Sequence, residues 1–144
     1  MKIILPVLAL ALMPIAAHSA PDEQVVLTMA KQTGLSPTEI RESYNACDSG
    51  VTRSMKICGA YRLTEQDLRL NRLYKQALTK AKEQGLEETL VKAQRAWLSY
   101  RDAQCPFEGR SNAEGGTAEG LYVLSCKLVL TKQQADRLEA IVRD

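Results

Sequence analysis

The stretch AQRAWLSYRDAQC, residues 93–105, gathers polar side chains around the one tryptophan of the chain. Gln94 precedes Trp97 by three residues and Arg101 follows it by four, so a helix places all three on one face. With Asn71 from an earlier helical stretch, they predict a polar network between two helices. Each polar group buried there without a partner would cost about 1–3 kcal/mol. The alternative function of this stretch is a ligand pocket.

Catalytic chemistry has few candidate residues in this chain. The single histidine, His18, lies in the amino-terminal leader, so histidine-based triads and metal sites are excluded once the leader is removed. Asp102 and Glu108 are near one another in sequence and are the candidate pair of carboxylates for a glycosidase mechanism. Isolated surface carboxylates are far more often solvated, so we expect no enzyme and no cofactor.

The first residues have the layout of a secretory signal peptide. Lys2 precedes an apolar run of about 15 residues, shorter than the roughly 20 needed to span a bilayer, and the small-residue site Ala17-His18-Ser19 ends it. We therefore expect a signal peptide at residues 1–19, a periplasmic location and no membrane anchor after cleavage. Of 19 basic and 17 acidic residues only Lys2 is lost, so the processed chain stays close to neutral. This balance argues against nucleic acid as a partner.

Four cysteines follow the leader: Cys47, Cys58, Cys105 and Cys126. An even number in an exported chain predicts two disulfides, and three pairings are possible. A zinc site is the alternative, but the closely spaced cysteine pairs that usually supply such ligands are missing. We expect no metal.

Helical signals run along nearly the whole chain. Residues 20–46 predict an amino-terminal extension of two short helices, the second capped by Ser36-Pro37. The remainder, residues 47–144, predicts one helical domain. The expected fold is all-α: a small disulfide-linked helical bundle built on a long antiparallel helix hairpin that turns at Gly85. The expected helices cover a short segment before Cys58 and residues 64–85, 86–105, 121–130 and 131–141.

Residues 106–120, PFEGRSNAEGGTAEG, contain four glycines, a proline and almost no apolar side chains. This composition predicts a loop between Cys105 and Cys126. A loop of this length in a compact domain is usually functional or disordered. The donors and acceptors that it could offer to a partner are Glu108, Arg110, Ser111 and Asn112.

Four motifs resemble the LprI-type lysozyme-inhibitor domain in order and spacing: CDSGVTRSMKIC, LNRLYKQAL, AQRAWLSYRDAQC and LTKQQADRL. The resemblance covers residues 47 to about 141. It implies a binding protein whose partner is a lysozyme or other cell-wall hydrolase, inhibited by steric occlusion of the cleft. Short loops favour the pairs Cys47–Cys58 and Cys105–Cys126, at roughly 3 kcal/mol each. The compact first cysteine pair of the family supports the first of them.

The same motifs and composition are compatible with two other functions. An immunity protein against a different wall-degrading toxin would use the same architecture with another partner. An envelope stress or adaptor protein without lysozyme activity is the principal alternative.

Overall fold

The computed structural model describes residues 20–143, so the signal peptide expected at residues 1–19 lies outside the described residues. Within this range the chain forms five α-helices and no strand, which confirms the all-α, disulfide-linked bundle. The helices are α1 (Glu23–Thr33), α2 (Pro37–Asn45), α3 (Thr52–Glu83), α4 (Glu87–Ala113) and α5 (Thr117–Arg143).

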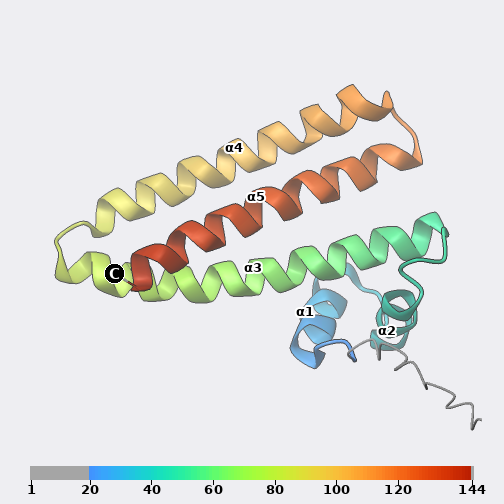
Figure 1. The fold of residues 1–144 in the computed structure, drawn as a ribbon, viewed down its shortest axis with the longest axis horizontal. Helices are drawn as coiled ribbons and strands as arrows, with labels where there is room; N and C mark the ends of the chain where they lie inside the picture. Colours follow the sequence, from blue (N-terminus) through green and yellow to red (C-terminus); the bar gives the residue numbers. More distant parts are fainter. Residues whose placement is uncertain (1–19, 144) are drawn as a thin grey trace, which may run out of the picture.

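The three long helices lie side by side, with α5 between α3 and α4 (Figure 1). The turn at Gly85, whose φ of 70° suits glycine, reverses the chain from α3 into α4 as the sequence predicts. A second reversal at Gly115-Gly116 sends α5 back along both helices. Direct contact between α3 and α4 is small because α5 packs against each of them.

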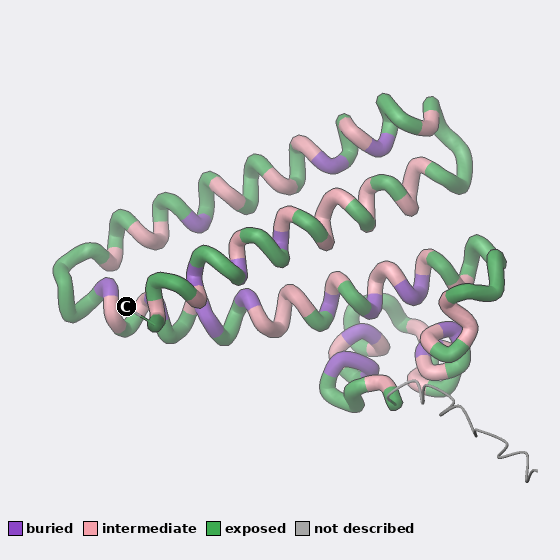
Figure 2. The backbone as a smooth tube through the Cα atoms, in the orientation of Figure 1, coloured by how far each residue is buried: buried purple, intermediate pink, exposed green. Residues whose placement is uncertain are grey.

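The two short helices begin and end close to the expected residues. The Ser36 hydroxyl caps α2 by accepting from the Glu39 backbone N–H at 3.1 Å, and Gly34 ends α1 in the left-handed conformation. Both helices pack on the first half of α3, and buried positions lie on all three helices there (Figure 2). The cluster that they bury there comprises Val25, Val26, Met29, Ile40, Ile57 and Tyr61.

Helix α3 is one continuous helix of 32 residues, so the separate short helix expected before Cys58 is wrong. Thr64, expected to open a new helix, lies buried in mid-helix and donates its hydroxyl to the Ala60 carbonyl at 2.9 Å. A threonine can satisfy itself in this way inside a helix, which is why its type alone did not fix a boundary.

The loop expected at residues 106–120 is also wrong. Helix α4 continues through Pro106 to Ala113, and α5 begins at Thr117, so only residues 114–116 connect them. A proline inside a helix costs about 3 kcal/mol through its missing N–H and its ring. Packing of α4 on α5 offsets that cost. Helix propensity alone does not predict this result, because it takes no account of contacts between helices.

Residues 121–130 and 131–141 belong to one helix, α5, rather than to two. Thr131, expected as a helix cap, is fully buried in the middle of α5. The central cluster below it joins α5 to α3 through Leu70, Leu73, Ala77, Ala135 and Leu138.

Both local disulfides are confirmed. Cys47 is bonded to Cys58, with Cα atoms 5.7 Å apart, and Cys105 to Cys126, with Cα atoms 5.4 Å apart. The first bond ties the segment that follows α2 to α3, and the second ties α4 to α5. No described helix combines the length and the apolar character that crossing a membrane requires.

Candidate partner-binding site

The end of the α4–α5 hairpin is the place where the candidate binding residues gather. Cys105 and Gly109 are its buried positions on α4, and the backbones approach closely there. An added Cβ at Gly109 would lie 2.5 Å from Val123 Cγ2 and 3.1 Å from the Glu119 carbonyl oxygen. This close approach and the Cys105–Cys126 disulfide both tie α4 to α5 near the tip.

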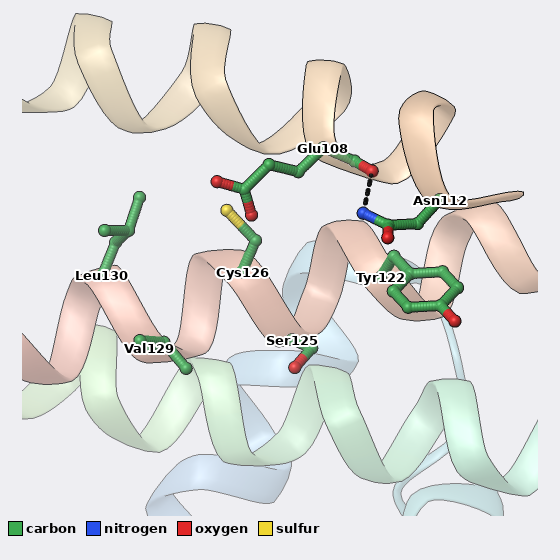
Figure 3. Close-up of a pocket in the computed structure, with 7 residues that line it drawn as sticks. All are labelled: Glu108, Asn112, Tyr122, Ser125, Cys126, Val129 and Leu130. Atoms are coloured by element: carbon green, nitrogen blue, oxygen red, sulfur yellow. Dashed lines mark hydrogen bonds between the residues drawn. The ribbon is translucent and has the colours of Figure 1, made fainter.

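One side of the tip carries a groove between α4 and α5 with a volume of ≈ 250 Å³ (Figure 3). Glu108 and Asn112 contribute its polar wall from α4. Gln104 Nε2 donates to Glu108 Oε1 at 2.8 Å, and Asn112 Nδ2 donates to the Glu108 carbonyl at 2.7 Å. The opposite wall comes from α5, with Tyr122, Ser125, Cys126, Val129 and Leu130.

The other side of the tip carries a wider and more exposed hollow of ≈ 520 Å³. Phe107 lies at its edge with 67% of its surface exposed, the largest exposed fraction among the large apolar residues of the described chain. Arg110 and Ser111, three and four residues further along α4, share this hollow with Pro106 and Glu114. We call these five residues the outer face of the tip.

The four residues expected to bind a partner therefore do not lie in one loop. They lie on the last turns of α4 and divide between its two sides. Glu108 and Asn112 face the groove, whereas Arg110 and Ser111 belong to the outer face. The separation follows from the helical period, which places residues four apart on the same side.

Trp97 and Arg101 lie together, as the sequence predicts. The guanidinium carbon of Arg101 is 5.1 Å from the centroid of the Trp97 ring, within the range of a cation–π contact. Arg101 Nη1 donates to Asp67 Oδ1 at 3.2 Å and to Thr131 Oγ1 at 3.1 Å. One side chain of α4 thus joins α3 and α5. Trp97 itself is half-buried and packs against the central cluster.

Gln94 and Asn71 lie apart from this arrangement. Gln94 is buried and accepts a hydrogen bond from Gln134 Nε2 of α5 at 2.9 Å. Asn71 is exposed on α3. The sequence predicts that α3 and α4 meet directly, but α5 packs between them. Gln94 therefore bonds to α5, and Arg101 bonds to α5 as well as to α3.

Asp67, Thr131 and Gln134 are the residues that sequence reasoning missed. Burial raises the pKa of the Asp67 carboxyl above its usual value, and the charge and hydrogen bond of Arg101 oppose this shift. Asp67 lies near the predicted start of one helix, and Thr131 lies at the predicted start of another. Aspartate and threonine are both common as helix caps. No local signal distinguished them from capping residues.

The tip can offer hydrogen bonds and apolar contact to a partner. The groove combines a carboxylate, an amide, a hydroxyl and a phenol. Within residues 20–143, no group of three or more His, Cys, Asp or Glu side chains could hold a metal ion.

Comparison with known proteins identifies the family of the chain. Residues 44–138 match the family model described as "Lysozyme inhibitor LprI". The chain is 31% identical over 119 residues to "Uncharacterized protein R02472" of Rhizobium meliloti (strain 1021), an alignment that covers 74% of this chain and 85% of that protein. No solved structure matches the chain. With its family model matched over most of the helical domain, the chain belongs to the LprI lysozyme-inhibitor family.

Proposed function

We propose that this protein is an exported inhibitor that blocks the cleft of a lysozyme with the outer face of the α4 tip. The observation that carries the proposal is the position of Phe107, two-thirds exposed, beside Arg110 on a rigid helix. Aromatic and arginine side chains supply most of the binding energy in many protein interfaces. The family membership supplies the class of partner.

The chemistry of the outer face suits a glycosidase cleft. Such clefts hold two carboxylates across the scissile bond, and an arginine can bind a carboxylate through two parallel hydrogen bonds. Arg110 is exposed and Ser111 adds a hydroxyl donor. Phe107 would fill an apolar subsite that normally receives a sugar ring.

Rigidity of the tip favours tight binding. A free loop must be ordered on binding, which lowers affinity, whereas a helix fixed by Cys105–Cys126 and by the Gly109 contact is already ordered. Glu108, Glu114 and Glu119 also lie at this end of the molecule. They would repel catalytic carboxylates, but they would attract the basic outer surface of many lysozymes and raise the association rate.

Export to the periplasm is part of the same proposal. Two disulfides in a small chain suit an oxidising compartment. The leader expected at residues 1–19 would supply the route. The alternatives, an immunity protein or an envelope adaptor without lysozyme activity, would not require the outer face to bind a muramidase.

Lysis of a peptidoglycan suspension by purified lysozymes of different types tests the proposal. Phe107→Ala and Arg110→Ala should each raise the concentration for half-inhibition by tenfold or more, which corresponds to about 1.4 kcal/mol. Tyr100→Ala is the matched control, because Tyr100 is also an exposed aromatic residue of α4, with 53% of its surface exposed. Asn112→Ala tests the groove on the other side.

The pattern of effects decides between surfaces. Loss of inhibition with Asn112→Ala alone would move the contact to the groove. Equal effects of Phe107→Ala and Tyr100→Ala would exclude the outer face as the specific contact. A folded wild-type protein that inhibits no lysozyme of any type would favour the adaptor function.

A further inference from the structure

A third hollow lies where α3 begins, beside the first residue of α5. Its volume is ≈ 400 Å³, within the roughly 300–1,000 Å³ typical of small-molecule sites. The surface that lines it is almost entirely apolar. The lining residues are Leu35, Thr52, Arg53, Lys56, Ile57 and Thr117.

Two cationic side chains, Arg53 and Lys56, contribute to this largely apolar lining. Arg53 is largely exposed and pairs with Glu39 of α2. Lys56 is half-buried, and in the described part of the chain no carboxylate forms an ion pair with it. An apolar hollow with an unpaired ammonium group suits a ligand that has an aliphatic body and a negatively charged end.

The position of Lys56 strengthens the preference for an anion. Its side chain reaches from α3 to the first turn of α5, where the position of a Cβ on Gly120 would be 3.4 Å from Lys56 Cε and 3.5 Å from Nζ. The first turn of a helix already carries partial positive charge, so a lysine there is disfavoured without a counter-ion. Glu119 lies in the same turn but forms no ion pair with Lys56 within the described residues. A bound carboxylate would neutralise the Lys56 ammonium group and interact favourably with the partial positive charge at the start of α5.

The amino-terminal extension forms one wall of this hollow. Leu35 lies in the connection between α1 and α2, outside the segment 44–138 that matches the family model. Ile57 on α3 is buried beneath it. The hollow is therefore a joint product of the extension and the family domain.

We propose that this hollow binds a monocarboxylate with an aliphatic chain, of the class of medium-chain fatty acids. The chain would lie against Leu35 and Ile57, with the carboxylate at Lys56 and Arg53. This inference does not depend on lysozyme inhibition, because the hollow and the outer face of the tip share no lining residue.

Titration of the protein with hexanoate, octanoate, decanoate and octanol, followed by backbone amide NMR shifts and calorimetry, tests the proposal. Shifts should concentrate at Thr117 and Gly120. Affinity should rise by up to about fourfold per added methylene, the equivalent of about 0.8 kcal/mol, until the hollow is full. Octanol should bind at least fivefold more weakly than octanoate.

Lys56→Gln should weaken octanoate by fivefold or more and leave octanol unchanged. Lys75→Gln, at an exposed position further along α3, is the matched control and should change neither. A thermal melt by circular dichroism shows that both variants are folded. Equal binding of octanol and octanoate, equal effects of the two substitutions, or no binding at millimolar octanoate would each overturn the proposal. Unchanged lysozyme inhibition in the presence of octanoate would separate this site from the outer face.

Discussion

Arg101 of α4 bonds to Asp67 of α3 across 3.2 Å, and the same nitrogen donates to the Thr131 hydroxyl of α5. One guanidinium group therefore holds the three long helices in register. Its side chain is only 13% exposed, whereas that of Asp67 is 40% exposed. Solvent screens the aspartate more than the arginine, so hydrogen bonding and burial contribute more than bare charge attraction.

Arg101→Ala should lower the free energy of unfolding by about 1–3 kcal/mol, because it leaves Asp67 and Thr131 without their partner. Urea denaturation followed by circular dichroism measures the change. Arg95→Ala, at an exposed position of the same helix, is the control and should change stability by less than about 0.5 kcal/mol. Equal effects of the two substitutions would show that the three-helix contact contributes nothing.

A rise in pH should have opposite effects on the stability contributed by two aspartates, Asp67 and Asp136. Burial raises the pKa of Asp67, so the native state holds this proton more tightly than the unfolded state. The stability contributed by Asp67 is therefore present at acidic pH and is lost as pH rises through its native pKa. Hydrogen bonds from Arg69 and then Lys132 lower the pKa of Asp136, so its contribution is present at neutral pH and is lost as pH falls.

Urea midpoints of wild type, Asp67→Asn and Asp136→Asn between pH ~3 and pH ~7 test these signs. The advantage of wild type over Asp67→Asn should shrink as pH rises. The advantage over Asp136→Asn should grow over the same range. Parallel curves for the two variants would contradict the assignment.

Gly109→Ala should destabilise the protein by about 1–3 kcal/mol, because its Cβ would meet Val123 Cγ2 at 2.5 Å and the backbone oxygen of Glu119. Alanine normally stabilises a helix over glycine by about 0.5–1 kcal/mol, so the sign is diagnostic. Gly59→Ala is the matched control, since its Cβ would make only ordinary contacts with Leu124 at 3.5 Å and 3.7 Å. That substitution should be neutral or stabilising.

A double variant, Gly109→Ala with Val123→Ala, separates the two clashes. It should recover part of the stability, because the closer contact is with the valine side chain. No recovery would place the whole cost at the Glu119 backbone. Thermal unfolding of wild type, Gly109→Ala, Gly59→Ala and the double variant under one set of conditions provides the comparison.

Trp97→Ala should cost less than the roughly 3–5 kcal/mol that follows removal of a fully buried aromatic side chain. Trp97 is half-buried, and the contact with Arg101 covers part of its ring. Acrylamide should quench its fluorescence in the native state less than in urea, but not negligibly. Complete protection from the quencher, or a cost above this range, would show that the ring is more deeply buried.

Several features of this protein follow from the sequence alone, because the signals are local. Ser36-Pro37 begins α2 and Gly34 ends α1, since a cap or a left-handed turn depends on residues within a few positions. The turn at Gly85 and the two short-range disulfides were predictable for the same reason. The family motifs, spread through the domain, identified the family.

Tertiary structure decided where the helices continue and which faces meet. Pro106 and Gly109 indicate a loop, yet α4 runs through both of them because Cys105 and Gly109 pack against α5. Likewise, Thr64 and Thr131 resemble caps but are buried inside helices. The placement of α5 between α3 and α4 divides the candidate binding residues between two sides of the tip and gives Arg101 its partners. Propensity is worth fractions of a kcal/mol per ordinary residue, whereas packing over a whole helix face is worth several, so long-range contacts overrule local signals where the two disagree.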